Sequence, residues 1–267
     1  MIRILAVALL TLPVWAGPTL DGGYGEMYNL DFAGAHRVFA EYQRVHPDDP
    51  LGPVSDAAAY LFSEFDRLHI LQSEFFVHDQ HFMTDHRLEP DPEIRRRFES
   101  ALDASGKLAE RAPDSAAAMF AMVLCRGLHS DYMALIEKRY LPSLREMKAG
   151  RELAEQLLAR HPEYADAWLA VGVENYMLSI KPAPLRFLLR MGGAETDRET
   201  GLARLRLTAE RGRYLAPFAR LMLAVAALRD GRRDKAAELL SHLVHDYPRN
   251  PLYAQELTRL ESAGARP

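Results

Sequence analysis

The stretch that decides the fold is residues 162–176, PEYADAWLAVGVENY. Pro162 ends one helix, because proline lacks the amide hydrogen that a helix interior requires. Ala167 and Trp168 open the next helix. Gly172 follows one turn later, where only a small residue lets two helices approach closely. The stretch therefore predicts the junction between two helical hairpins.

Helical periodicity extends over most of the chain. Apolar residues recur at helical spacing, and no segment shows sustained strand alternation. Thr196 and Glu199 have the spacing of a capping box, in which each side chain binds a free backbone amide. Together these patterns predict an all-α protein with helices over residues 31–46, 54–71, 91–111, 115–128, 142–161, 166–179, 196–212, 214–228 and 234–247.

Four predicted helix ends are similar to one another: YQRVHPDDP, LAERAPDS, LLARHPEYADAW and LVHDYPRNPLY. Together with Trp168 and Gly172, this self-similarity resembles the tetratricopeptide repeat, whose pattern is a Trp, then Leu-Gly, then Tyr, with a Pro closing the preceding unit. The intervals between the prolines are uneven, so the chain is not a regular array of units of about 34 residues. The resemblance covers about half of the chain at the level of motifs.

The units differ in how well they fit the repeat. The first places Ala35 and Phe39 before its closing proline, and the last places Ala224 and Ala236 at the small positions of its two helices. The unit ending at Pro113 is degenerate, because Ser105 stands where a large apolar residue is expected. The resemblance implies a right-handed superhelix of antiparallel helix pairs with irregular insertions, in which each hairpin buries its apolar face against the next.

Residues 1–16 have the features of a signal peptide. Arg3 precedes a charge-free apolar run over residues 4–15, and small or compact residues lead up to a cleavage site after Ala16. The run is shorter than the roughly 20 apolar residues that span a bilayer. We expect export to the bacterial periplasm or medium, no membrane span after cleavage, and a single helical repeat domain over residues 17–267. The alternative interpretation is a buried N-terminal helix.

Composition excludes several classes of function. The formal net charge of -4 provides no basic excess for binding nucleic acid. Cys125 is the only cysteine, so no internal disulfide forms, and its apolar helical surroundings predict a buried core residue. Phosphate-loop, dinucleotide-binding and nucleophile-elbow motifs are absent from the sequence, and we expect no cofactor.

One loop carries residues that could bind a metal. His78, His81 and His86 lie close together, with Asp79 and Asp85 between them. Imidazole and carboxylate groups are ligands for Zn²⁺ and similar ions. The HExxH motif is missing, so we interpret the segment as a polar surface loop without a metal. A metal-dependent enzyme at these histidines is the alternative.

The sequence favours a non-catalytic scaffold or adaptor that holds a protein or peptide in a concave groove. The repeat that the chain resembles implies the groove positions Asp166, Leu169, Val173, Tyr176, Phe218, Leu221, Val225 and Leu228. Most of these are apolar, which leaves two alternatives: the groove binds an apolar or helical segment, or the insertion over residues 180–193 folds back and fills it. A further alternative is a fixed accessory subunit of an envelope assembly. The sequence specifies neither the partner nor the oligomeric state.

Overall fold

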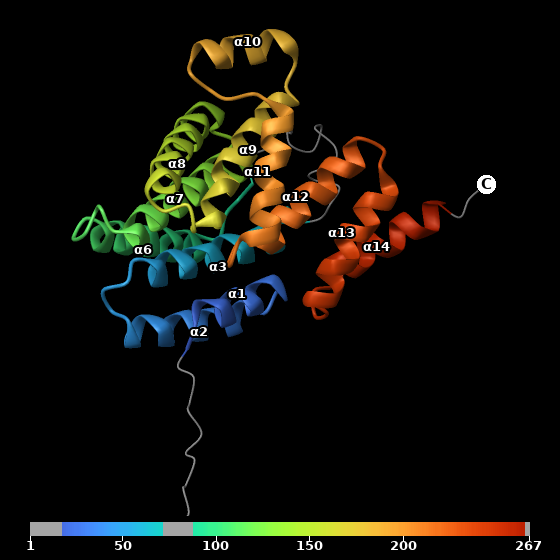
Figure 1. Cartoon of the computed structure of the whole chain (residues 1–267). Coiled ribbons are helices and arrows are strands. Elements are labelled where there is room, and N and C mark those ends of the chain that lie inside the picture. Colours follow the sequence, from blue (N-terminus) through green and yellow to red (C-terminus); the bar gives the residue numbers. More distant parts are fainter. Residues whose placement is uncertain (1–17, 72–87, 265–267) are drawn as a thin grey trace, which may run out of the picture.

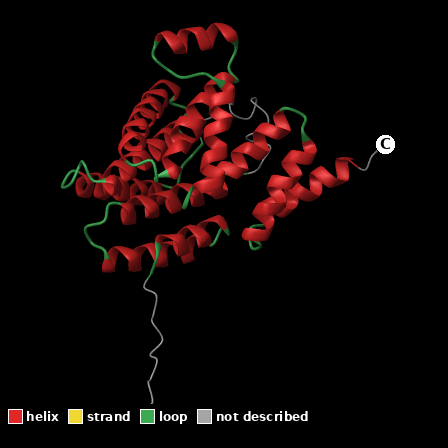
Figure 2. Cartoon of the chain, in the orientation of Figure 1, coloured by secondary structure: helices red, strands yellow, loops and turns green. Residues whose placement is uncertain are grey.

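The structure, a computed structural model, describes residues 18–71 and 88–264 (Figure 1). Within these ranges the chain is helical and contains no strand, which confirms the predicted all-α fold (Figure 2). The α-helices are α1 (Leu20–Tyr28), α2 (Phe32–Val45), α3 (Leu51–Arg67), α6 (Pro92–Ala109), α7 (Ala116–Asp131), α8 (Tyr140–Arg160), α9 (Trp168–Ser179), α10 (Ala183–Met191), α11 (Arg198–Arg211), α12 (Ala216–Arg229), α13 (Arg233–Asp246) and α14 (Pro251–Gly264). A π-helical turn, Tyr132–Ile136, follows α7, and a 3-10 turn, Ala165–Ala167, precedes α9.

Helices pack mainly against their neighbours in sequence. Successive contacts run from α1 through α2, α3, α6, α7, α8 and α9, and then from α11 through α12 and α13 to α14. Helix α10 interrupts this order, because α9 packs directly against α11. The arrangement is that of an α-solenoid-like protein built from neighbouring helix pairs, and it is compatible with a helical repeat.

Side chains cap the helices at three starts. The Asp31 carboxylate accepts the backbone N–H of Gly34 at 2.7 Å, and the Ser115 hydroxyl accepts that of Ala118 at 3.2 Å. Asp91 caps α6 by accepting two backbone N–H groups, with proline at the first helical position. These contacts satisfy amides that have no partner within the helix.

The predicted capping box at the start of α11 is wrong. Asp197 is the N-cap residue, and its carboxylate accepts the backbone N–H of Thr200 at 2.6 Å. The hydroxyl of Thr196 instead accepts a hydrogen bond from Nε of Arg190, at 2.5 Å. An aspartate at the following position therefore replaces the threonine as the cap, which frees Thr196 to hold the segment after α10.

Three of the four similar helix ends also share one backbone geometry. The terminal residues His46, His161 and Tyr247 have φ between -123° and -135° and ψ between 65° and 71°. Each donates its backbone N–H to the carbonyl four residues earlier, and each is followed by proline. The fourth end departs from the pattern, because Glu110 at the end of α6 keeps helical dihedrals. The sequence similarity therefore corresponds to a shared backbone geometry at three of the four helix ends.

The degenerate unit contains a buried polar contact. Ser105 is fully buried, and its hydroxyl donates to the carbonyl of Pro50 at 2.8 Å. That bond satisfies a group that would be costly to bury alone. Cys125 is buried as predicted, and burial raises the pKa of its thiol to about 11, so the thiol remains protonated at neutral pH.

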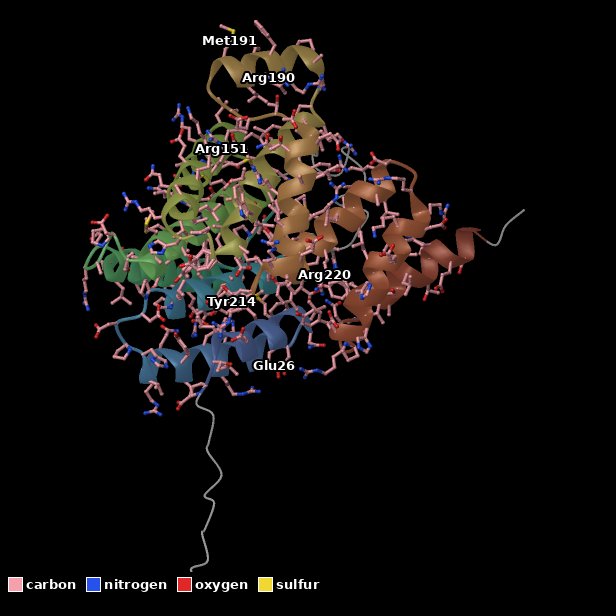
Figure 3. All side chains as sticks on the ribbon, in the orientation of Figure 1. Glu26, Arg151, Arg190, Met191, Tyr214 and Arg220 are labelled. Atoms are coloured by element: carbon pink, nitrogen blue, oxygen red, sulfur yellow. The ribbon has the colours of Figure 1, made fainter. Side chains whose placement is uncertain are left out.

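The first helix, α1, contacts residues from the C-terminal part of the chain. The Tyr28 hydroxyl donates to the carbonyl of Tyr214 at 3.0 Å, and the Asn250 side-chain amide donates to the carbonyl of Tyr28 at 2.9 Å. The rings of Tyr24 and Tyr214 stack with centroids 5.1 Å apart. Helix α1 thus binds the loops that precede α12 and α14, near the position of Tyr214 in Figure 3.

Three helices differ from the sequence predictions. The segment that begins α1 reads as a loop because of its glycines, yet it is helical. Pro182 and Pro184 interrupt the chain after α9 as the sequence predicts. The segment that follows nevertheless forms α10, a helix that the sequence does not predict, because proline is tolerated at a helix start. Helix α14 extends the chain beyond the last predicted helix. The predicted loop with His78, His81 and His86 lies outside the described residues.

Candidate partner-binding surface

The eight predicted groove positions fall into two groups in the structure. Asp166, Tyr176 and Val225 are buried within the protein. The other five are partly exposed and form what we call the apolar surface of α9 and α12, namely Leu169, Val173, Phe218, Leu221 and Leu228.

Asp166 organises the loop between the two hairpins. Its carboxylate accepts backbone N–H groups from Arg213 at 2.9 Å, Tyr214 at 3.2 Å and Leu215 at 2.8 Å. Burial raises the pKa of Asp166, and these hydrogen bonds oppose that shift by favouring the charged form. The carboxylate thus fixes the chain immediately before α12, which sets the position of the second hairpin relative to α9.

Tyr176 is a core residue. Its side chain is 1% exposed and packs in a cluster with Leu202 and Leu205 of α11 and Met222 of α12. Val225 is also buried, on α12. Substitution of either residue would therefore disturb packing between the helices before it altered any contact with a partner.

The apolar surface of α9 and α12 borders three parts of the core. Leu169 and Val173 pack against the cluster that contains Tyr176. Leu221 and Leu228 pack against a separate cluster formed by α12, α13 and α14. Phe218 also contacts Phe62 of α3 edge-to-face, with ring centroids 5.9 Å apart. The five side chains of the apolar surface of α9 and α12 are therefore packed against the core and partly exposed.

The insertion over residues 180–193 begins with Ile180, which is partly buried against the same cluster as Leu169 and Val173. Most of the remaining insertion forms α10, and no residue of this helix is buried. Large apolar side chains of α10 are exposed instead, among them Phe187 and Met191.

A hollow between α11, α12 and α13 lies beside the second hairpin. Its volume is about 380 Å³, and its apolar lining includes Leu202, Leu223 and Leu239. Charged side chains of both signs surround it, including Arg206 and Glu238. This mixture of an apolar floor and a charged rim resembles the anatomy of protein interfaces.

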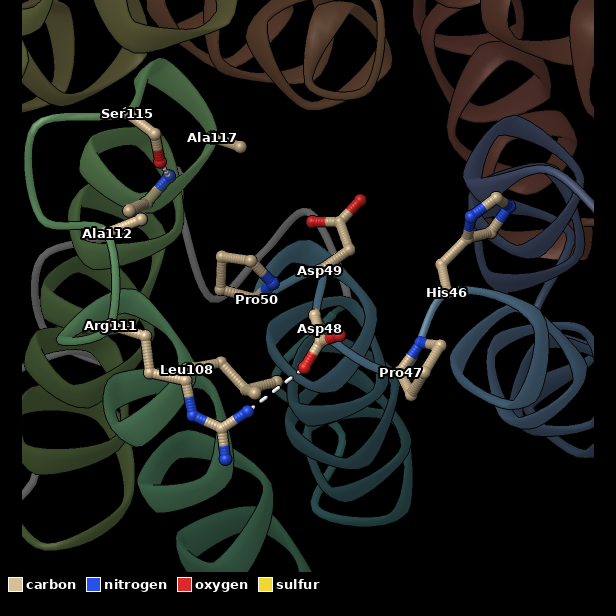
Figure 4. A pocket seen from close by; sticks show the side chains of 11 residues that line it. His46, Pro47, Asp48, Asp49, Pro50, Leu108, Arg111, Ala112, Ser115 and Ala117 are labelled. Atoms are coloured by element: carbon tan, nitrogen blue, oxygen red, sulfur yellow. Dashed lines mark hydrogen bonds and ion pairs between the residues drawn. The ribbon is translucent and has the colours of Figure 1, made fainter.

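A second hollow, of about 540 Å³, separates the loop after α2 from the turn between α6 and α7 (Figure 4). Three of its polar side chains take part in hydrogen bonds or ion pairs. Asp48 pairs with Arg111 at 3.0 Å, and Asp49 accepts from the Tyr42 hydroxyl at 2.5 Å. Ser115 caps α7. These contacts hold the ends of helices.

A histidine–carboxylate pair borders a third hollow, of about 500 Å³, between α3 and α6. Nδ1 of His36 lies 2.6 Å from the Asp56 carboxylate, and the His36 ring packs on Tyr60 with centroids 4.0 Å apart. Such a pair can act as a general base when a nucleophile is in reach. Among the residues that the structure describes, no nucleophilic side chain hydrogen-bonds to His36.

Metal-ligating groups do not converge in the described ranges. No group of three or more His, Cys, Asp or Glu side chains lies close enough there to hold an ion. His78, His81 and His86 fall outside those ranges, so their role stays a prediction.

A buried polar network joins α8, α9 and the segment after α10. The Glu174 carboxylate accepts Nε of Arg151 at 3.2 Å and the backbone N–H of Glu195 at 3.0 Å. The neighbouring Asn175 accepts the backbone N–H of Asp197 at 3.0 Å. Burial raises the pKa of Glu174, while the bonds it accepts and the charge of Arg151 lower it. The adjacent Glu and Asn in an otherwise apolar helix are the sequence signal for this network.

Over residues 18–71 and 88–264, every helix is too short or too polar to cross a bilayer.

Comparison with known proteins gives no match: no protein-family model, no curated protein and no solved structure is significantly similar to this chain.

Proposed function

We propose that the protein is a non-catalytic scaffold or adaptor that binds a protein or peptide through the apolar surface of α9 and α12. The observation that carries the proposal is the partial exposure of five apolar side chains on the first helices of two successive hairpins. The adjoining side chains Tyr176 and Val225 are buried. The core therefore supports these five residues and leaves each of them partly exposed.

Two further features support a tetratricopeptide-like origin for these hairpins. The helix ends at His46, His161 and Tyr247 share one geometry, as expected of repeated units. Gly172 lies against Leu205 of the paired helix, at the small-residue position of the repeat. Repeats of this kind stack hairpins and use their exposed faces to bind extended or helical segments.

The surface favours an apolar or helical segment as its ligand. An amphipathic helix binds a groove through apolar residues spaced three or four apart, which match the spacing of the side chains on α9 and α12. Leu221 and Leu228 lie two turns apart on α12, and Leu169 and Val173 lie one turn apart on α9.

We further propose that the chain acts in the bacterial cell envelope. The basis is the signal-like sequence of residues 1–16, which predicts a mature N-terminus at Gly17. Intact-mass measurement of the protein exported by a bacterial host tests this proposal. Retention of Met1–Ala16 in a membrane-extracted form would contradict it.

Photo-crosslinking tests the binding surface. A photoreactive amino acid at Leu169 or Leu221 should give the same discrete adduct in native envelopes, whereas one at exposed Leu141 of α8 should not. The captured partner, once purified, should bind the wild type and lose affinity for Leu221→Asp. Circular dichroism of each variant confirms that the fold is retained. Equal adducts at all three positions, or none at the two surface positions, would remove this surface as the binding site.

The experiment also separates the proposal from its alternatives. A partner that co-purifies in fixed stoichiometry identifies an accessory subunit. A stoichiometric metal in untagged protein prepared without chelators, lost in His81→Ala, would instead support the metal-dependent enzyme.

A further inference from the structure

Helix α10 has its apolar side turned outward. Figure 1 shows it standing away from the other helices, and Figure 3 shows Met191 at its outer edge. Four large apolar side chains are strongly exposed: Leu185 at 44%, Phe187 at 64%, Leu188 at 63% and Met191 at 73%. An amphipathic helix of a water-soluble domain normally turns that side toward the core.

The polar side of α10 faces the protein. Arg186 donates to the carbonyls of Ser179 and Lys181, each at 3.1 Å, and thereby binds the end of α9. Arg190, one turn later, donates to the Thr196 hydroxyl. Both arginines are therefore used to attach the helix, and the apolar side chains lie on the opposite side.

The segment after α10 is fastened in the same way. Nζ of Lys148 donates to the carbonyl of Gly192 at 3.0 Å, and Arg151 donates to that of Gly193 at 3.4 Å. Since Arg151 is itself held by the buried Glu174, the attachment continues into the core. Both ends of α10 are thus anchored, which fixes the outward orientation of its apolar side.

Charge indicates what covers this side. Residues 180–194 contain three basic residues, Lys181, Arg186 and Arg190, and no acidic residue. Arg190 is exposed, and Lys181 and Arg186 are partly exposed, so the hydrogen bonds to the protein leave their positive charge beside the apolar side. Basic groups beside an exposed apolar helix face are a feature of helices that lie in the interface of a membrane with anionic lipids.

Size argues against a second copy of the chain on α10 alone. Nine residues of helix extend only about 13.5 Å. Even if each of the four side chains had the roughly 150–250 Å² of an aromatic side chain, their exposures of 44–73% would leave less than the about 800 Å² per partner of a stable interface. Two copies would also bring like-charged segments together. A bilayer accepts a short projecting helix without a matching groove, because lipids rearrange around it.

We propose that α10 is an interfacial membrane anchor, which inserts its apolar side into the surface of an anionic phospholipid bilayer while its arginines hold the protein. This site is separate from the apolar surface of α9 and α12, so a partner and the membrane can bind together. The function it adds is to confine a partner-binding protein to a membrane surface.

Vesicle flotation tests the proposal. Protein purified from an exporting host, with the same N-terminus verified by intact mass in every variant, is mixed with neutral phosphatidylcholine vesicles or with vesicles of about one-third phosphatidylglycerol. The wild type should float with the anionic vesicles, and Leu188→Glu should reduce the bound fraction at least about tenfold. Leu141→Glu, at a side chain that is 72% exposed on α8, should leave it unchanged.

A fluorescent variant makes the test specific to insertion. Phe187→Trp should show emission quenched by brominated lipids beyond that of the wild type, which carries Trp168 and, where residues 1–16 are retained, Trp15. Absence of binding to anionic vesicles, or equal binding by Leu188→Glu, would overturn the proposal. So would a dimer in solution that Leu188→Glu dissociates, because a second copy would then cover α10. Crosslinking at Leu169 and Leu221 is unaffected by these outcomes, so the two proposals fail independently.

Discussion

A Cβ atom at Gly172 of α9 would lie 3.0 Å from Cγ of Leu205 in the facing helix α11. The prediction that Gly172 occupies the contact between two paired helices is therefore confirmed. The approach is closer still one turn along, where a Cβ at Gly201 of α11 would lie 2.6 Å from the backbone nitrogen of Tyr176. One glycine from each helix thus permits the contact, which brings backbones together as well as side chains.

Gly172→Leu should destabilise the protein by about 1–3 kcal/mol, because the added side chain must push Leu205 or the helices apart. The melting temperature should fall by several degrees. Gly106→Ala provides the control, since a Cβ there meets no atom within 4 Å. That control should instead gain about 0.5–1 kcal/mol from helix propensity. Equal stability of Gly172→Leu and the wild type would show that the contact is not tight.

Asp166 should prove to be a structural residue. Asp166→Ala leaves the backbone N–H groups of Arg213, Tyr214 and Leu215 without their acceptor. We expect a loss of about 2–3 kcal/mol in chemical denaturation, the penalty for unsatisfied buried donors. Asp114→Ala, at a carboxylate that is highly exposed, is the matched control and should change stability by less than about 1 kcal/mol. If the Asp166→Ala variant were as stable as the wild type but no longer bound the partner, Asp166 would instead be a binding residue.

The sequence predicts local features better than long-range ones. The caps at Asp31, Asp91 and Ser115 follow from chemistry within a few residues, and so does the end of α8 at His161. The all-α fold follows from periodicity in the same way. Gly172 is a tertiary contact that the sequence predicts correctly, because a glycine inside a helix needs a packing reason.

The sequence alone does not show which of the groove positions implied by the repeat are buried and which are partly exposed. Tyr176 is buried because Leu202, Leu205 and Met222 surround it, and these belong to helices separated from α9 by the α10 insertion. The contact of α1 with the C-terminal part of the chain depends on partners such as Tyr214 that lie nearly 200 positions away, for which no local pattern exists.

The stacked pair of Tyr24 and Tyr214 should couple the first helix to the second half of the chain. Their centroids lie 5.1 Å apart with an interplanar angle of 26°. A double-mutant cycle with Tyr24→Ala and Tyr214→Ala should give a coupling free energy of about 0.5–1.5 kcal/mol. The exposed side chains of Asp103 and Lys107 on α6 serve as the reference cycle and should couple by no more than about 0.5 kcal/mol. Additive effects of the two tyrosine substitutions would show that this ring contact does not couple α1 to the second half of the chain.

Asp131 should make stability depend on pH. It lies at the end of α7, directly before the π-helical turn, and burial raises the pKa of its carboxyl from 3.8 to about 7. Between these values the folded protein binds a proton that the unfolded chain releases, so this carboxyl stabilises the fold at low pH. That contribution declines as pH rises from about 4 to about 7. Burial raises the pKa of Asp166 and Glu174 in the same direction, so the decline is not due to Asp131 alone.

The Asp131→Asn variant isolates the contribution of Asp131 to the pH dependence of stability, because the amide resembles the protonated carboxyl in shape and cannot ionise. Urea denaturation should give similar stability for the variant and the wild type near about pH 4.5, and a more stable variant near about pH 7.5. Asp91→Asn is the informative control, since backbone hydrogen bonds from Ile94 and Glu93 lower the pKa of Asp91. Its contribution has the opposite sign: it is present above about pH 4 and lost as the pH falls, so this variant should be the less stable protein near neutral pH. If the difference between Asp131→Asn and the wild type were the same at both pH values, the carboxyl would titrate alike in the folded and unfolded chains, and burial at the end of α7 would not govern it.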